Sequence, residues 1–279
     1  MKNIILIPTD FSVVCNEAVH YGAELAKKLN ASITIVHIVN KASISKLNNP
    51  KMPELEIQKK LTEISQQLSS KFNLLVETIF REGSIYSTIN EIAIEIGAKL
   101  LVLGTHGKVG VQQQLTGSFA HKVVSSSDIP VIIMQEGIHF NEGIKKIVFP
   151  MSSTANVRQK VNWAVQIAKI FNATIYLFKF QEVLKEDRMA MNIVEHQVTD
   201  EFDKNSIQFE IHDAEKGRNF ANQVLLFSKT IHAELIMIMS NPDKLNFIFS
   251  PYDEQIMFNK NNIPTMLINP RELMVYHWY

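Results

Sequence analysis

The chain repeats itself, and this repeat constrains its fold more than any other feature of the sequence. Pro8 recurs as Pro150 and Asn30 recurs as Asn172, both at the same spacing. The runs AKLLVLGTHG and IPVIIM recur in the same order as AELIMIMSNP and IPTMLI. A repeat of this length in a chain of 279 residues indicates two duplicated domains rather than a solenoid. We place the junction in the polar stretch 135–143 and expect domains at 1–138 and 143–279.

Within each copy, short apolar runs alternate with stretches of helical periodicity. Runs that are apolar throughout are typical of strands buried on both faces of a parallel sheet. The expected strands are residues 3–8, 32–38, 74–81, 99–104 and 130–134, then 145–150, 173–180, 206–213, 234–240 and 264–269. This β-α alternation predicts an α/β protein of two tandem, doubly wound, Rossmann-like domains with helices on both faces of each sheet.

Three helices of the first copy can be placed by their patterns. Residues 13–29 carry apolar side chains at helical spacing. Residues 84–97 do the same, with Ser84 as a plausible N-cap and Gly97 as a C-terminal stop. Residues 47–72 predict a loop followed by a long surface helix.

Composition excludes several classes of protein. Lys+Arg and Asp+Glu are 28 each, so no global field favours nucleic acid or an anionic membrane. The single cysteine, Cys15, permits no intrachain disulfide and fits a reducing compartment. The N-terminal apolar run is too short for a signal peptide, and no run of eighteen apolar residues occurs. We expect a cytoplasmic protein without a membrane segment.

Four of the ten glycines fall within fourteen residues, at Gly104, Gly107, Gly110 and Gly117. They follow an expected strand and precede a helix-like stretch, 119–124. A strand, a glycine-rich loop and a helix N-terminus form an arrangement that cradles phosphates, because bare amides can approach an anion closely. The alternative is a surface loop without a ligand.

The spacing Gly104-x2-Gly107-x9-Gly117-Ser118 resembles the ATP-binding signature of universal stress proteins. The run PTDFS after the first strand, the run IVHIV in the second and the run DIPVIIM at the fifth also resemble that family. The resemblance covers nearly the whole chain as two copies, but only the first copy has the glycine signature. It implies a sheet of order 3-2-1-4-5 in each domain, with the ligand between strands 1 and 4.

The resemblance also implies an ATP site in the first copy. Pro8, Thr9 and Asp10 would line the adenosine side, and the backbone of Ile38 would contact adenine. The ribose and phosphates would meet the glycine-rich loop and the start of the next helix, at Gly104, Thr105, His106, Gly107, Gly117, Ser118 and Phe119. Magnesium would accompany the nucleotide rather than a ligand set visible in the sequence.

Several polar residues have competing interpretations. Asp10 suits a ribose hydroxyl or a metal-bound water, but it could instead cap the helix that starts at Val13. His106 could meet a phosphate, yet we expect a hydrogen bond without proton transfer. We expect Cys15 to pack rather than to act as a nucleophile, and His37 to pack on its strand. We therefore assign no catalytic residue.

The second copy lacks the features that a nucleotide would need. Asp10 corresponds to Ser152, Gly104 to Met239 and Gly107 to Pro242. Met239 would place a side chain where backbone should meet phosphate, and proline has no N–H. We expect no ATP in the second domain.

The fifth strands, 131–134 and 265–268, are short, apolar and expected at sheet edges, which invite pairing. We expect an internal pseudo-dimer of the two domains through these strands. A further homodimer and an unknown regulatory protein partner are compatible with the sequence.

The leading function is a stress-response regulator that binds ATP, or a related adenine nucleotide, in the first domain. The alternatives are a slow ATPase or ATP-using enzyme of a related fold, and an adaptor that binds no nucleotide. ATP-activating ligases carry an SGGxDS-type loop after the first strand, but this chain reads PTDFSVV there, without glycine.

Overall fold

The computed structural model describes residues 3–39, 54–105, 117–138, 140, 143–153, 157–182, 184–240 and 250–270, with only the backbone described at 117–119 and 157–158. We call the part from β1 to β5 the first half and the part from β6 to β10 the second half. The first half contains β1 (Ile4–Pro8), α1 (Val13–Leu29), β2 (Ser32–Val39), α3 (Glu54–Phe72), β3 (Val76–Glu82), α4 (Ile85–Glu95), β4 (Leu100–Gly104), α5 (Gly117–Ser126) and β5 (Val131–Met134). The second half contains β6 (Lys146–Met151), α6 (Val157–Phe171), β7 (Thr174–Lys179), α7 (Lys185–Lys204), β8 (Phe209–Asp213), α8 (Phe220–Thr230), β9 (Leu235–Met239), α9 (Pro251–Met257) and β10 (Thr265–Ile268).

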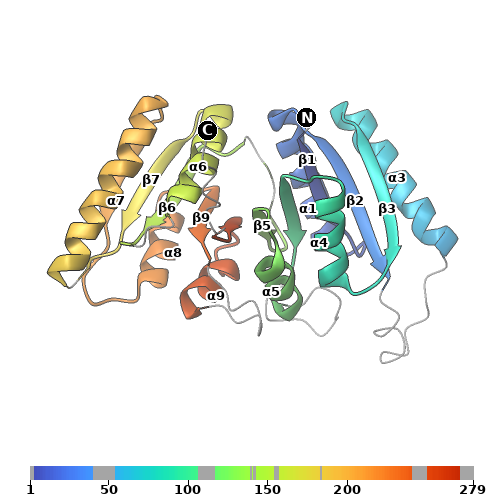
Figure 1. Cartoon of the computed structure of the whole chain (residues 1–279). Helices are drawn as coiled ribbons and strands as arrows, with labels where there is room; N and C mark the ends of the chain where they lie inside the picture. Colours follow the sequence, from blue (N-terminus) through green and yellow to red (C-terminus); the bar gives the residue numbers. More distant parts are fainter. Residues whose placement is uncertain are drawn as a thin grey trace, which may run out of the picture.

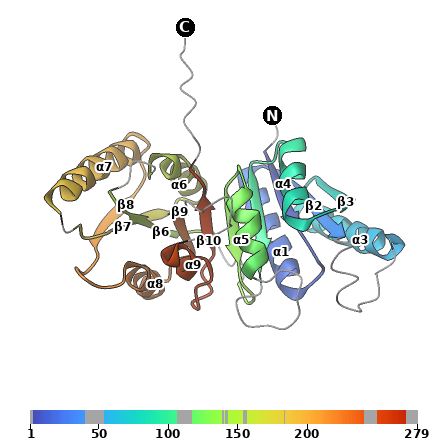
Figure 2. The same ribbon diagram turned by 60° about the horizontal axis from the view of Figure 1, so that its bottom comes forward.

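All of these strands belong to one continuous sheet of order β3-β2-β1-β4-β5-β10-β9-β6-β7-β8. Each half is parallel with the order 3-2-1-4-5, and the halves meet where β5 pairs with β10 in antiparallel fashion. Figures 1 and 2 show the two halves side by side, with β5 and β10 at the boundary between them. The predicted fold class is therefore confirmed. The predicted strands match the observed ones except at their ends, most of all at 206–213, where β8 begins at Phe209.

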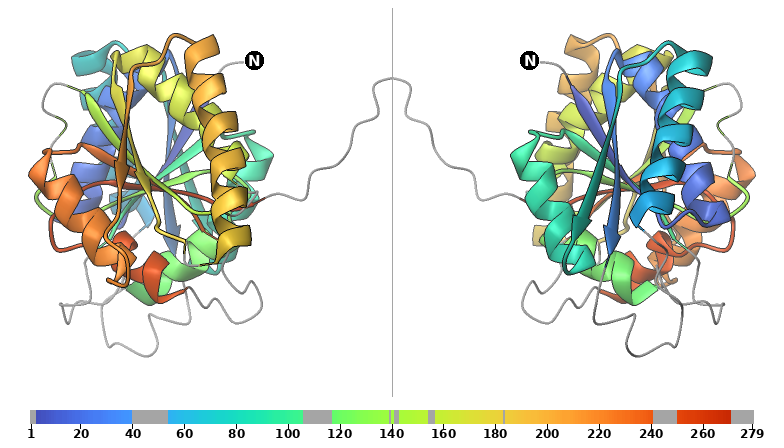
Figure 3. Two further views of the ribbon diagram at one scale, coloured as in Figure 1. Left: turned by 90° about the vertical axis from the view of Figure 1, so that its left-hand side faces the viewer. Right: turned by 90° about the vertical axis from the view of Figure 1, so that its right-hand side faces the viewer.

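Helices cover both faces of the sheet because inner strands such as β4, β5 and β10 are apolar and buried on both sides. Figure 3 shows α3 and α4 on opposite sides of the first half, and α7 and α8 on opposite sides of the second. Alternate residues of β1 divide between two cores, with Ile5 and Ile7 in one and Leu6 in the other. Each such buried side chain contributes about 1.5–3 kcal/mol of hydrophobic free energy.

Residues with a left-handed backbone end α1 and α4, and the chain returns from there to the sheet. α1 ends at Asn30, whose backbone is left-handed at φ 50°. Gly97, at φ 65°, follows α4, and the amide of Ala98 donates to Ala93 O. Glycine tolerates this backbone without strain, so its predicted role as a stop is confirmed. Ser84 does hold the N-cap position of α4, but its side chain makes no capping hydrogen bond.

The joint between the halves combines strand pairing with side-chain contacts. Thr265, Met266 and Leu267 pair with Ile133, Ile132 and Val131, respectively. Beyond the end of β10, Asn269 Nδ2 donates to Val124 O at 2.5 Å and to Ser127 O at 3.0 Å, both at the end of α5. The predicted pseudo-dimer through the fifth strands is therefore confirmed as an intrachain interface. Among the described residues, no helix is both long and apolar enough to cross a membrane.

Introducing charge at this joint should destabilise the protein. Val131 is 1% exposed, so Val131→Lys should lower the free energy of unfolding by about 3 kcal/mol or more, because a lysine there has no buried partner. Leu226→Lys is the control, since Leu226 is 67% exposed and its change should stay within about 0.5 kcal/mol. Urea denaturation of both variants measures the difference, and equal stability would contradict the buried joint.

Candidate functional site

The strands of the first half separate at their carboxyl ends between β1 and β4. These two strands pair only at Ile5 with Leu100 and at Leu6 with Leu101, whereas β1 stays paired with β2 as far as Pro8. The strand order reverses at the same place, so the connections that leave β1 and β4 run to opposite faces of the sheet. In open α/β sheets, ligands bind outside the carboxyl ends of the strands at such a reversal.

The structure brings most of the described candidate residues to this edge. Pro8 ends β1 and is followed by Thr9 and Asp10, Ile38 lies one residue before the end of β2, and Gly104 ends β4 with Thr105 after it. Gly117, Ser118 and Phe119 form the first turn of α5, whose N-terminus returns to the same edge because α5 links the parallel strands β4 and β5. His106 and Gly107 lie outside the described residues.

The turn after β1 is held by its own side chains. Thr9 Oγ1 accepts the Phe11 amide at 3.0 Å, and Asp10 Oδ1 accepts the Ser12 amide at 2.9 Å. Ser12, not Asp10, is the N-cap of α1, because its side chain accepts the Cys15 amide. The alternative interpretation of Asp10 as the cap is therefore wrong. Asp10 orients the capping residue and keeps acceptor capacity on its carboxylate.

His37 also lies at this edge. The sequence predicted only that it packs on its strand, but the structure shows a polar contact as well. Its Nδ1 lies 2.7 Å from Thr9 O, and since a carbonyl only accepts, Nδ1 carries the proton. Burial lowers the pKa of its imidazole. The Phe11 ring stacks on His37 with centroids 4.7 Å apart. Phe11 has φ 66°, which costs a bulky residue about 1–2 kcal/mol, so the surrounding contacts must hold it there.

Cys15 is fully buried, as its predicted packing role requires. Burial and the nearby charge of Asp10 raise the pKa of its thiol to about 12. A thiol with so high a pKa is not a nucleophile at neutral pH.

Glycine is required at position 104 because a side chain would not fit there, not because the backbone needs an unusual conformation. A Cβ at this position would lie 2.6 Å from Val14 O and 3.2 Å from the Ala18 Cβ. Helix α1 thus rests directly on the end of β4. Small residues on both elements permit this approach, and they keep the helix backbone beside the gap between β1 and β4.

The second half fills the same gap with large side chains. Met239 ends β9 as Gly104 ends β4. Lys160 is the repeat counterpart of Ala18, because the same spacing relates Pro150 to Pro8. Lys160 is 2% exposed, and its Nζ donates to Pro150 O at 2.6 Å and to Met237 O at 3.1 Å. Strands β6 and β9 diverge there as β1 and β4 do, and Lys160 Nζ donates to carbonyls that the divergence leaves without a strand partner.

Lys160 pairs with no described carboxylate. Its Nζ lies 3.8 Å from the centroid of the Phe149 ring, so a ring face is its third neighbour. Burial lowers its pKa well below 10.5. Lysine in the apolar stripe of the helix spanning 157–171 was the signal in the sequence that could have revealed this contact.

Aromatic rings and a carboxylate occupy the rest of the carboxyl edge in the second half. Phe180, the repeat counterpart of Ile38, packs edge-on against Phe220 at 5.2 Å, and Phe220 stacks on Tyr252 at 5.7 Å. Asp253 lies in the first turn of α9 and is 5% exposed, and burial raises the pKa of its carboxyl. Ser240 Oγ donates to Asp253 Oδ2 at 3.3 Å. A phosphate at the α9 N-terminus would meet this acidic group.

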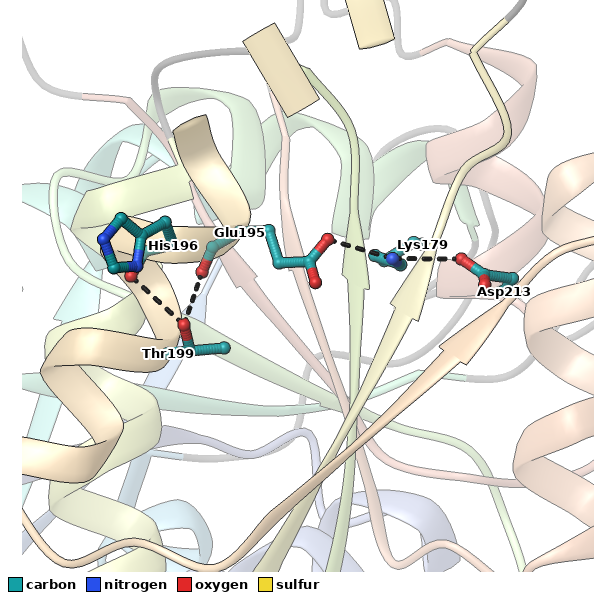
Figure 4. Close-up of polar contacts among 5 residues, drawn as sticks. All are labelled: Lys179, Glu195, His196, Thr199 and Asp213. Atoms are coloured by element: carbon teal, nitrogen blue, oxygen red, sulfur yellow. Dashed lines mark hydrogen bonds and ion pairs between the residues drawn. The ribbon is translucent and has the colours of Figure 1, made fainter. Parts of the chain in front are cut away.

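A charged cluster at the ends of β7 and β8 closes the outer part of that edge (Figure 4). Lys179, the repeat counterpart of His37, lies between Glu195 Oε2 at 2.9 Å and Asp213 Oδ1 at 3.2 Å. Burial disfavours the ammonium, but the hydrogen bonds to these carboxylates outweigh burial and raise the pKa of Lys179. On the next turn of α7, Thr199 Oγ1 donates to Glu195 O. This cluster fastens α7 and β8 to β7.

Comparison with known proteins identifies the family. The model of the universal stress protein family matches residues 1–135. A universal stress protein of Methanocaldococcus jannaschii is 30% identical over 139 residues, covering 47% of this chain and 81% of the relative. The universal stress protein YxiE of Bacillus subtilis is 28% identical over 148 residues, covering 48% of this chain and 100% of the relative. The chain therefore belongs to the universal stress protein family.

Solved structures show the same tandem fold over nearly the whole chain. A universal stress protein of Archaeoglobus fulgidus superposes with a TM-score of 0.76 at 17% identity, covering 97% of this chain and 100% of that one. A putative universal stress protein of Pseudomonas aeruginosa superposes with a TM-score of 0.63 at 12% identity, covering 96% and 94%. The expected family and its two-copy architecture are confirmed.

Adding one methyl group at Gly104 should push α1 away from β4. Gly104→Ala should lower the free energy of unfolding by about 1–3 kcal/mol, because the new Cβ meets backbone that cannot rotate aside. Ser69→Ala is the control, because it also changes a single side-chain heavy atom but lies on the half-buried surface of α3. Chemical denaturation compares the two, and an unchanged stability in Gly104→Ala would contradict the close contact.

The buried lysine predicts a pH dependence of stability. The folded pKa of Lys160 lies below 10.5, so the unfolded chain binds more protons between these two values, and stability should rise with pH there. The free energy of unfolding of the unaltered protein, relative to Lys160→Met, should therefore increase as pH rises from neutrality towards 10.5. Lys229→Met, on the exposed surface of α8, is the control. A difference that stays constant with pH would contradict a lowered pKa.

Proposed function

We propose that the protein is a stress-response regulator that binds ATP, or a related adenine nucleotide, in its first half only. The observation that carries this proposal is the convergence of Thr9, Asp10 and Gly104 at the edge where the strand order reverses. Asp10 would accept hydrogen bonds from the ribose, and Ile38 would lie against adenine. The amides at the start of α5 would receive the phosphates, because a helix N-terminus favours anions.

The contrast between the halves supports a single site. At the corresponding edge, the second half has Met239 in place of glycine, an acidic Asp253 in the first turn of α9, and rings stacked on Phe220. A bound nucleotide would have to displace packed, half-buried side chains and tolerate a carboxylate near its phosphates. Both effects oppose binding, so we assign one nucleotide to each chain.

Helix α5 gives occupancy a way to reach the second half. The N-terminal turn of α5 would hold phosphate, and two turns later Val124 O accepts a hydrogen bond from Asn269. Between them, His121 Nε2 lies 3.6 Å from Glu254 Oε1 of α9, and its ring lies 5.2 Å from that of Phe258. A shift of α5 on binding would therefore alter contacts across the joint, which requires differential affinity but no hydrolysis.

Magnesium would enter with the phosphates. Within the part of the chain that the structure describes, no group of three or more His, Cys, Asp or Glu side chains is arranged to hold a metal ion. Asp10, in the turn that follows β1, could bind a metal-coordinated water. The proposal therefore requires nucleotide binding and at most slow turnover.

Titration calorimetry with ATP, ADP and AMP tests the proposal. Gly117→Val should weaken ATP binding at least about tenfold, about 1.4 kcal/mol, because a branched side chain would crowd the amides at the start of α5. Met239→Leu, at the matching strand end of the second half, should leave the affinity and the stoichiometry of one unchanged. Absence of saturable binding would instead favour the adaptor, and rapid release of phosphate would favour an enzyme.

A further inference from the structure

A concave site lies between α1 and α3, next to the turn that follows β1. It is an open groove of about 330 Å³, at the lower end of the usual size for small-molecule sites. Half-buried Phe11 and Ile64 supply its apolar walls, and Val19 and Leu68, which are 2% and 1% exposed, form its floor. In the right-hand view of Figure 3, α1 and α3 lie on one side of the sheet and α4 lies on the other. The groove therefore opens on the α1–α3 face.

Phe11 forms the end of this groove nearest the carboxyl edge. Its backbone is left-handed, with φ 66°, and its ring stacks on His37. Lys60 Nζ of α3 lies 5.4 Å from the centroid of the same ring. A bulky side chain held at positive φ is uncommon outside functional or strained sites. This wall of the groove is therefore held by contacts with both His37 and Lys60.

The rim of the groove carries one positive and one negative side chain, both from α3. Lys60 and Glu63 both line it, three residues apart on α3 and so about 4.5 Å apart along the helix axis. Their ion pairs with Glu56, at 3.4 Å, and Lys59, at 3.9 Å, are solvent-exposed pairs four residues apart. Such pairs contribute little, so a ligand can compete for both charges.

The remaining polar groups on the rim are neutral. Asn16 and Gln67 present amides, and burial together with the charge of Lys71 lowers the pKa of His20. The groove thus offers one cation, one anion, neutral hydrogen-bonding groups and an apolar floor.

We propose that this groove binds a small zwitterion with an apolar side group, of the α-amino acid class. The ligand carboxylate would pair with Lys60, and its ammonium would pair with Glu63. Its side group would lie against Phe11 and Ile64, over the floor of the groove. Glu63 opposes a ligand that carries only negative charge, such as a nucleotide phosphate. A wholly apolar ligand would desolvate both charges without compensation. This site is separate from the proposed nucleotide site and requires no nucleotide.

Calorimetry and amide chemical shifts of the full chain, without nucleotide, test the proposal with L-phenylalanine and L-leucine as probes. We expect saturable binding with a Kd of about 1 mM or below, and shifts at Phe11, Val19 and Leu68. N-acetyl-L-phenylalanine amide, which lacks both charges, should bind at least about tenfold more weakly. Lys60→Met and Glu63→Gln should each weaken L-phenylalanine binding to a similar extent.

Matched controls lie on the same helix. Lys59→Met and Glu56→Gln remove neighbouring charges outside the groove, and they should leave binding within about twofold. The proposal is overturned if neither amino acid binds saturably, if the uncharged derivative binds equally well, or if the controls weaken binding as much as the groove variants. Because ATP is absent throughout, failure here leaves the nucleotide site untouched, and success does not depend on it.

Discussion

The antiparallel pairing of β5 with β10 is the interaction on which the rest of the architecture depends. Each half alone would end in a short strand, apolar on both faces, with unpaired backbone groups along one edge. Pairing Val131 to Ile133 with Thr265 to Leu267 removes both edges and merges two five-stranded sheets into one. The apolar cores on the two faces then continue from one half into the other.

This arrangement places two similar strand reversals in one molecule, and the chain fills them differently. In the first half, Gly104 and Ala18 are small, so α1 rests on β4. The turn after β1, held by Thr9 and Asp10, lies at the same edge. In the second half, Met239 and Lys160 occupy those positions, and the lysine satisfies backbone carbonyls that would otherwise be buried without partners. The same backbone design thus has small residues at one strand reversal and large side chains at the other.

Sequence patterns predicted the fold well because the signals were redundant. Apolar runs marked the strands, the repeat fixed the domain count, and the resemblance supplied the strand order. The candidate site was predicted less completely. Asp10 lies at the carboxyl edge, but the N-cap of α1 is Ser12, the residue directly before Val13, and the Asp10 carboxylate instead accepts the Ser12 amide. His37 was assigned to packing alone, since nothing in the sequence shows that its ring meets Thr9 O.

The sequence by itself determined the periodicity, the duplication, the family and the loss of glycines in the second copy, because each is a property of neighbouring residues or of fixed spacings. Only the tertiary structure decided what depends on elements distant in the chain. It set the approach of Val14 to Gly104, the two carbonyls around Lys160, and the groove between α1 and α3 with Lys60 above Phe11. These contacts depend on where strands diverge and how helices pack on the sheet. Local sequence patterns do not encode that arrangement.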